Sequence, residues 1–196
     1  EYREFERCST VAANAYIGPR VREYVRGIDD HIAQAGFRGK FLLVQSTGGL
    51  YESKQAEEEC VRMLESGPAA GVIGAGALCR ALGLQQAVAF DMGGTTAKAS
   101  LVESGQPTLT TEYEFREGMS TSSRFIKAGG YMLKVPAIDI AEVGAGAGSI
   151  AGIDDGGLLR VGPESAGADP GPACYGQGGR RPTVTDANVV LGFLNP

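Results

Sequence analysis

The first apolar positions of the chain follow a helical period. From Ser9 to about Ala35 the pattern predicts an α-helix with one apolar stripe. The positions of that stripe are Val21, Tyr24, Val25, Ile28 and Ile32. Gly18-Pro19 precedes the stripe, and a proline inside a helix removes a hydrogen bond, so we expect a kink or an interruption there.

Shorter apolar runs follow and predict alternating strands and helices. Residues 41–44 predict a buried strand, and 53–64 a polar helix. A helix rich in small residues is expected from Ser66 to about Leu82, with Ser66 as its N-cap and Gly83 ending it.

The second half of the chain predicts mostly strands. Residues 87–91, 97–103 and 108–115 are expected to be strands, and 135–143 an extended segment. The residues 149–153 and 158–161 flank Asp-Asp-Gly-Gly, which indicates a hairpin. Gly162 to Pro182 is too rich in Gly and Pro for regular structure and is expected to be a functional or interface loop. A strand at 183–185 and a short helix capped by Asp186 end the pattern, so the chain is predicted to be an α/β protein.

Thirty glycines among 196 residues are about twice the usual share, and they are clustered. One cluster, Asp91-Met-Gly-Gly-Thr-Thr, joins two predicted strands; we call residues 91–96 the phosphate hairpin. Glycines permit a turn whose N–H groups point at an anion, and the hydroxyls of Thr95 and Thr96 add donors. Asp91 is suited to Mg²⁺, because that ion prefers oxygen ligands. A plain hairpin with ordinary turn residues is the alternative.

The second cluster is Gly-Ala-Gly-Ala-Gly-Ser at 144–149, which we call the glycine-rich turn. It superficially resembles a dinucleotide-binding fingerprint, but a hairpin signal follows it where that fold needs a crossover helix. The sequence of a P-loop, Gly-x-x-x-x-Gly-Lys-Ser/Thr, is absent. The two clusters therefore need another explanation than these common motifs.

Composition excludes several classes of partner. The net charge is -5, and the basic residues are scattered, so a nucleic-acid surface is not expected. No apolar stretch approaches the roughly 20 residues that span a bilayer, and the four cysteines lack metal or redox spacing, so we expect a cytoplasmic protein with reduced thiols. His31 lacks recognisable metal partners and is expected to be a helix-surface residue.

Several motifs resemble the hydantoinase A family, which includes 5-oxoprolinase and subunits of acetone-type carboxylases. These motifs are Ser-Gly-Pro-Ala-Ala-Gly at 66–71, Phe-Asp-Met-Gly-Gly-Thr-Thr-Ala-Lys at 90–98, Val-Gly-Ala-Gly-Ala-Gly-Ser-Ile-Ala at 143–151, Val-Gly-Pro-Glu-Ser-Ala-Gly-Ala-Asp-Pro-Gly-Pro-Ala-Cys-Tyr-Gly at 161–176 and Thr-Val-Thr-Asp-Ala-Asn-Val-Val-Leu-Gly at 183–192. The resemblance covers essentially the whole chain. Two positions depart from common members of that family: Ala147 stands where a glycine is usual, and Lys98 where many relatives have Asp.

The resemblance implies an α/β fold, the second lobe of an actin-like (ribonuclease H-like) ATPase with a mixed sheet and flanking helices. It implies that residues 1–196 are a fragment of the hydantoinase A domain, with a first phosphate-hairpin lobe upstream of them. The implied cofactors are ATP and Mg²⁺. Asp91 would be the catalytic metal ligand, Gly93, Gly94, Thr95 and Thr96 would bind phosphate, and Gly144, Gly146 and Ser149 would border the nucleotide.

The activity implied by the resemblance is ATP-dependent hydrolysis of a cyclic amide, of the hydantoin or 5-oxoproline type, through phosphorylation of its carbonyl. A B-type hydantoinase subunit is the implied partner, and the fragment alone is expected to be inactive. The alternatives are a subunit of an ATP-dependent ketone carboxylase, a nucleotide-binding module without chemistry, or a purely structural subunit. Glu142 is expected either in the nucleotide cleft or in an ion pair. Cys174 is expected to serve structure or subunit docking, with a catalytic thiol as the alternative.

Overall fold

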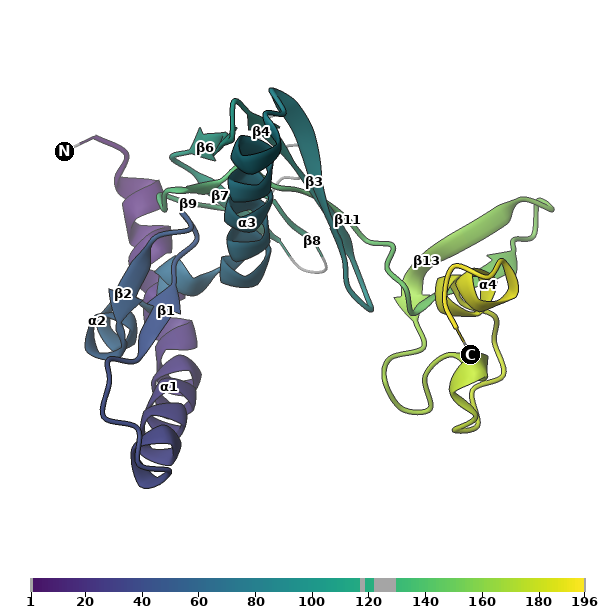
Figure 1. The fold of residues 1–196 in the computed structure, drawn as a ribbon, viewed down its shortest axis with the longest axis horizontal. Coiled ribbons are helices and arrows are strands. Elements are labelled where there is room, and N and C mark those ends of the chain that lie inside the picture. Colours follow the sequence, from purple (N-terminus) through teal and green to yellow (C-terminus); the bar gives the residue numbers. More distant parts are fainter. Residues whose placement is uncertain (1, 117–118, 122–129, 196) are drawn as a thin grey trace. The chain divides into compact units, whose positions relative to one another are not determined.

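The computed structural model describes residues 2–116, 119–121 and 130–195 of the chain (Figure 1). These residues form two compact units. The larger unit contains Glu1–Ala89 and Ser100–Ala141, and the smaller unit contains Phe90–Ala99 and Glu142–Pro196.

The first helix of the larger unit is α1, Glu4–Gln34, which continues through Pro19. Of the kink or interruption expected at Gly18-Pro19, the interruption is therefore wrong. Pro19 and Ala15 are both exposed, so the carbonyl of Ala15, which loses its amide donor at Pro19, faces water. Further along α1, Val25 is fully buried.

Two short strands and a broken helix pack on α1. The strand β1 (Leu42–Val44) pairs antiparallel with β2 (Leu50–Glu52), a strand that the sequence did not predict. The helix expected at 53–64 is divided into α2 (Ser53–Glu58) and a 3₁₀ helix, η1 (Cys60–Met63). The core of this part consists of Val25, Leu43, Tyr51 and Ala56.

Side chains from elsewhere in the fold explain the break between α2 and η1. The amide nitrogen of Asn14 donates to the carbonyl of Glu58 at 2.9 Å, and its oxygen accepts from the N–H of Val61 at 2.9 Å. The hydroxyl of Ser46 lies 2.7 Å from the carbonyl of Arg62 and 2.6 Å from that of Leu64. These contacts satisfy backbone groups that a longer helix would pair internally.

The helix α3, Ser66–Leu82, covers the second core of the larger unit. Gly83 ends it in the left-handed conformation, at φ 69°, as predicted. Glu65 holds the N-cap position and the side chain of Ser66 makes no capping bond, so the predicted cap at Ser66 is wrong. The core residues are Ala69, Val72, Cys79, Val102, Ile138 and Ile140.

The strands β3 (Gln86–Met92) and β4 (Ala97–Glu103) match the prediction closely. With β11 (Ala141–Val143) they form a sheet in the order β11–β4–β3, and β5 (Gln106–Pro107) pairs with β4. In the predicted 135–143 segment, β10 (Ala137–Ile138) precedes β11 and pairs with β6 (Leu109–Thr110). A further sheet has the order β8–β7–β9, from Met119–Thr121, Tyr113–Arg116 and Tyr131–Leu133.

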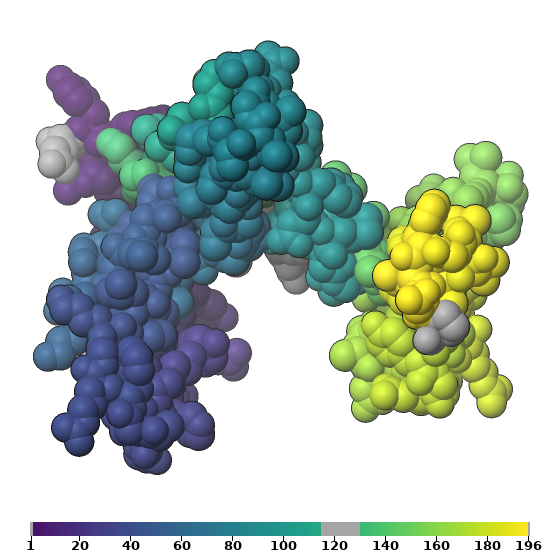
Figure 2. All heavy atoms as spheres, viewed as in Figure 1, coloured from purple at the N-terminus to yellow at the C-terminus, as the bar shows by residue number. Residues whose placement is uncertain are grey.

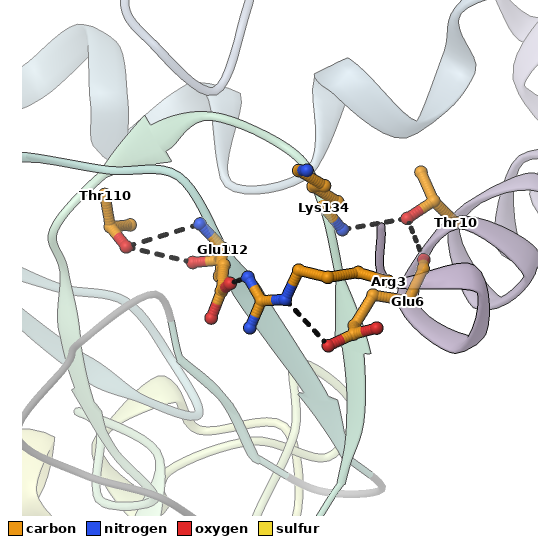
Figure 3. A network of polar contacts seen from close by, with 6 residues as sticks. All are labelled: Arg3, Glu6, Thr10, Thr110, Glu112 and Lys134. Atoms are coloured by element: carbon orange, nitrogen blue, oxygen red, sulfur yellow. Dashed lines mark hydrogen bonds and ion pairs between the residues drawn. The ribbon is translucent and has the colours of Figure 1, made fainter. Parts of the chain in front are cut away.

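The strand predicted at 108–115 is therefore two strands, β6 and β7, separated at residues 111–112. A polar network at this point also holds the start of α1 (Figure 3). Arg3 contacts both Glu6 and Glu112, and Thr110 Oγ1 bonds the backbone of Glu112. Thr10 Oγ1 accepts the N–H of Lys134 at 2.8 Å. The turn at 111–112 thus makes polar bonds of its own that interrupt the strand.

In the smaller unit, β12 (Ser149–Ile153) and β13 (Leu159–Ser165) form the predicted antiparallel hairpin. Asp154 Oδ1 closes its turn by accepting the N–H groups of Gly156 and Leu158, each at 3.0 Å. The loop that follows contains one 3₁₀ turn, η2 (Ala173–Tyr175).

The last helix, α4, spans Val184–Val190, so the strand predicted at 183–185 is wrong. Thr183 is the N-cap and Asp186 the third helical residue of a capping box, which sets the helix start. The N–H of Cys174 donates to Asp186, which joins α4 to the preceding loop, and Figure 2 shows the yellow atoms of α4 against yellow-green loop atoms.

Candidate nucleotide-binding site

The phosphate hairpin lies between the end of β3 and the start of β4. The N–H of Gly93 donates to the carbonyl of Thr96 at 3.0 Å and closes the turn. Residues 91–95 are exposed. The N–H groups of Gly94, Thr95 and Thr96 have no hydrogen-bond partner among the residues that the structure describes. Backbone donors without a protein partner are satisfied by water or by an anion, so this turn is suited to phosphate.

Asp91 is the carboxylate of this turn and is exposed at the end of β3. Within the described ranges no group of three or more His, Cys, Asp or Glu residues is placed to hold a metal ion. A single carboxylate fits Mg²⁺, which usually keeps several waters and takes further oxygens from substrate phosphates. Asp91 is therefore able to hold that ion only together with a phosphate ligand and water.

The glycine-rich turn is closed by its own polar groups. The N–H of Gly146 donates to Ser149 Oγ at 2.7 Å, and the N–H of Ser149 donates to the carbonyl of Gly146 at 3.0 Å. Ser149 is fully buried. Its hydroxyl has a structural partner, and its contact with a nucleotide stays a prediction, as do those of Gly144 and Gly146.

The glycine-rich turn packs directly on the phosphate hairpin. The N–H of Ala147 donates to the carbonyl of Gly93 at 2.9 Å, and that of Gly148 to the carbonyl of Gly94 at 2.7 Å. A Cβ atom at Gly146 would lie 2.6 Å from backbone atoms of Thr95 and Thr96. The two motifs, about fifty residues apart in the sequence, thus form one backbone assembly inside the smaller unit.

Ala147 fits this assembly with its methyl group. Arg3, Glu65 and Ser104 are the non-glycine residues described with a positive φ, so Ala147 lies outside the left-handed region. A methyl group therefore brings no backbone strain at this position, and the departure from the family pattern is compatible with the turn.

Lys98 and Glu142 form a buried ion pair next to the hairpin. The Nζ–Oε1 distance is 3.5 Å, and the side chains are 16% and 9% exposed. The sequence left two alternatives for Glu142, a place in the nucleotide cleft or an ion pair, and the structure contains the ion pair. Removing one member of such a pair leaves an uncompensated buried charge, so both residues contribute to the local fold.

Asp186 joins the Gly/Pro-rich loop to α4. Its carboxylate accepts the N–H of Cys174 at 2.7 Å, and the N–H and hydroxyl of Thr183, each at 2.8 Å. Burial acts to raise the pKa of Asp186, but these hydrogen bonds outweigh it and hold that pKa well below its usual range. The hydrogen bond to Asp186 and partial burial raise the pKa of the Cys174 thiol. A raised thiol pKa opposes nucleophilic use at neutral pH and favours a structural role for this loop.

We expect iodoacetamide to alkylate Cys174 at pH 8 more slowly in the folded protein than in the urea-unfolded chain. The thiolate reacts, and the neighbouring Asp186 carboxylate disfavours it. Asp186→Asn removes that charge and is expected to speed the reaction of the folded protein. Peptide mass spectrometry measures both rates, and equal rates for Cys174 in the folded and unfolded chains contradict the prediction.

An apolar cavity of about 430 Å³ lies in the larger unit, between α1 and β9. Phe5, Tyr16, Leu64 and Leu133 line it. It presents almost no polar surface, and a triphosphate needs concentrated hydrogen-bond donors. The cavity is therefore a poor candidate for the nucleotide phosphates.

Two residues of this assembly were not predicted from the sequence. Gly148, for which a Cβ would lie 2.9 Å from the Gly94 carbonyl oxygen, belonged to a noticed cluster, and its spacing from Gly146 was the available signal. Thr185 donates from both its N–H and its hydroxyl to the carbonyl of Ala147, each at 2.8 Å. No sequence signal indicated this contact, because Thr185 fell in a wrongly predicted strand.

Comparison with known proteins gives consistent matches. The model of the Hydantoinase/oxoprolinase family matches residues 7–196. The chain is 50% identical to an uncharacterized protein of Methanocaldococcus jannaschii, over 99% of this chain and 28% of that protein. It is 39% identical to the caprolactamase subunit alpha of Pseudomonas jessenii, over 99% of this chain and 26% of that subunit.

Two solved structures share the fold across the whole chain. A nucleotide-free acetone carboxylase, studied for ATP-dependent acetone carboxylation, gives a TM-score of 0.78 at 28% identity, over 26% of its own chain. The ATP-dependent caprolactamase of Pseudomonas jessenii gives 0.70 at 38% identity, also over 26% of its chain. The predicted α/β fold class is confirmed. The chain spans about a quarter of the length of these relatives, and none of its described helices is long and apolar enough to cross a membrane.

Proposed function

This chain belongs to the hydantoinase/oxoprolinase family, and from that premise we propose that it supplies a phosphate-binding lobe of an ATP-dependent enzyme that hydrolyses a cyclic amide. The hydantoin or 5-oxoproline type is the proposed substrate class. One observation carries the proposal: three N–H groups of the phosphate hairpin, those of Gly94, Thr95 and Thr96, have no partner among the described residues, and the exposed Asp91 begins the same hairpin. Relatives named caprolactamase and 5-oxoprolinase support it.

The chemistry explains the use of ATP. An amide carbonyl is a poor electrophile, so its oxygen would attack the γ-phosphorus, with cleavage of the bond between that phosphorus and the bridging oxygen of ADP. A first water would then add to the activated carbon and the C–N bond of the ring would break, with the nitrogen taking a proton, to leave an acyl phosphate. A second water would cleave that acyl phosphate to the carboxylate and inorganic phosphate. Catalysis of phosphoryl transfer consists mainly of positioning and charge stabilisation.

In this reaction the residues of the hairpin bind and orient phosphate. The N–H of Gly93 closes the turn, and those of Gly94, Thr95 and Thr96, with the two threonine hydroxyls, would donate to phosphate oxygens. Asp91 would hold Mg²⁺, which supplies charge neutralisation when bound. Gly144, Gly146 and Ser149 remain proposed neighbours of the nucleotide.

We extend the proposal to the partners. A second lobe with its own phosphate hairpin, from outside residues 1–196, would cover the other side of the nucleotide. A B-type hydantoinase subunit would complete the enzyme. Relatives named as subunits, of caprolactamase and of acetophenone carboxylase, support a multi-subunit assembly.

ATP-dependent carboxylation of a ketone is the second candidate. The acetone carboxylase structure resembles this chain with a TM-score of 0.78, against 0.70 for the caprolactamase. The identity to the caprolactamase subunit alpha is 39%, against 36% for the acetophenone carboxylase gamma subunit and 29% for the acetone carboxylase beta subunit, and this difference favours the cyclic amide. The two reactions differ in their need for bicarbonate, which separates them experimentally.

The test is ATP consumption by the full-length protein, purified with any partner subunit, against a panel of cyclic amides and of ketones with bicarbonate. We expect Mg-ATP binding by isothermal titration and ATP hydrolysis that a cyclic amide stimulates. Residues 1–196 alone are expected to bind Mg-ATP weakly or undetectably. Binding without stimulation by any substrate would support a nucleotide-binding module, and no binding to the full-length protein would refute the proposal.

A further inference from the structure

A continuous set of hydrogen bonds runs through the smaller unit from α4 to the phosphate hairpin. Thr185, in the first turn of α4, donates twice to the carbonyl of Ala147, from its N–H and from its Oγ1, each at 2.8 Å. The N–H of Ala147 donates to the carbonyl of Gly93 at 2.9 Å. The residue Ala147 is therefore held on one side by Thr185 and on the other side by the hairpin.

Thr185 is buried, with 7% of its surface exposed. The N-cap Thr183 is 2% exposed and fixes the start of α4 through its reciprocal bonds with Asp186. A buried hydroxyl in a fixed helical turn is a rigid donor, because its side chain has lost its rotational freedom. The position of Thr185 is thus set by α4 and not by the turn that it contacts.

Resting on the proposed function, we infer that Thr185 is a positioning residue for nucleotide binding, acting through the backbone of Ala147 on the phosphate hairpin. It touches neither nucleotide nor substrate in this role. The hydroxyl and N–H of Thr185 hold the glycine-rich turn in position. In that position the N–H groups of Ala147 and Gly148 donate to the carbonyls of Gly93 and Gly94. The hairpin amides are thereby fixed before phosphate arrives, which reduces the ordering that binding requires.

The test replaces Thr185 in the full-length protein by valine and by serine. Thr185→Val keeps the size and branching but removes the hydroxyl donor, whereas Thr185→Ser keeps the donor and removes only the methyl group. We expect Thr185→Val to raise the KM for Mg-ATP by about three- to tenfold, the range of one net hydrogen bond. The KM for the cyclic amide should stay unchanged, and Thr185→Ser should restore the wild-type values.

Hydrogen–deuterium exchange of peptides covering residues 91–97 and 144–149 measures how well the backbone amides of the two turns are protected, without any nucleotide. We expect faster exchange in both peptides for Thr185→Val, with the amide of Gly93 as the reporter in the hairpin, and wild-type exchange for Thr185→Ser. If Thr185→Val does not fold, the exchange of Thr185→Ser decides alone. Faster exchange of residues 91–97 in Thr185→Ser would show that the methyl group, and not the hydroxyl, holds the hairpin, and would overturn the inference. A change confined to α4, or an equal rise in both KM values, also overturns it.

A failure of the proposed function gives a different result. In that case wild-type protein binds no Mg-ATP, and the exchange data alone decide whether Thr185 positions the hairpin. Changed exchange at residues 91–97 in a protein that binds no ATP would refute the proposed nucleotide-binding function. It would still support the claim that Thr185 positions the hairpin.

Discussion

Replacing Asp91 with asparagine is expected to lower Mg-dependent ATP turnover of the full-length protein by at least about a hundredfold. The amide has nearly the size of the carboxylate but lacks the charge that holds Mg²⁺, and removing a single electrostatic group from a reacting centre costs about 10²–10³ in rate. Initial rates of ATP hydrolysis over a range of Mg²⁺ concentrations measure the loss. Asp91 is exposed, so the melting temperature should change little.

Asp155→Asn is the matched control for this substitution. Asp155 is an exposed carboxylate of the same unit, in the turn between β12 and β13. The Asp155→Asn substitution removes the same charge and should leave turnover within about twofold of wild type. This corresponds to the roughly ±0.5 kcal/mol expected for a change at the surface. Wild-type turnover in both the Asp91 and the Asp155 variants would remove Asp91 from the site. The same loss of turnover in both variants would indicate an effect of net charge.

Local sequence chemistry predicted the elements whose ends are set by their own residues. Gly83 ends α3 because glycine adopts the left-handed conformation without strain, and Asp154 closes the β12–β13 turn with its own carboxylate. The phosphate hairpin belongs to this class, since its glycines and flanking apolar runs are contiguous. For such segments the pattern along the chain contains the physical cause.

Other elements are set by residues distant in the sequence and were missed. Asn14 bonds the backbone at Glu58 and Val61 and divides a helix that the pattern predicted to be continuous. The segment Thr183–Thr185 has the β-branched composition of a strand, but the capping box with Asp186 makes it the start of a helix. In both cases hydrogen bonds of polar side chains overrode the local propensity.

The candidate site shows the same division. The sequence identified the hairpin and the glycine-rich turn as separate motifs, with different expected roles toward a nucleotide. It did not indicate that Ala147 and Gly148 would bond the carbonyls of Gly93 and Gly94, because periodicity carries no information on contacts across fifty residues. Gly146 and Gly148 are accordingly explained first by the closeness of two backbones.

Gly146→Ala is expected to have the second large effect. The added methyl group would lie 2.6 Å from the backbone of Thr95 and Thr96, where no flexible side chain is able to move aside. We expect the free energy of unfolding of the smaller unit to fall by about 1–3 kcal/mol, as for overpacked sites. ATP turnover of the full-length protein should fall at least tenfold, because the displaced atoms carry the phosphate donors.

Gly144→Ala provides the control within the same turn. A methyl group there meets no closer atom than Pro163 Cβ, at 4.0 Å, and Gly144 does not have a positive φ. This variant should keep the unfolding midpoint of the wild type, so a loss of stability confined to Gly146→Ala would be the effect of the close backbone approach. If both alanines were tolerated equally, the close approach of the two backbones would not constrain the hairpin. If both abolished turnover while stability was retained, the glycine-rich turn would contact the nucleotide itself.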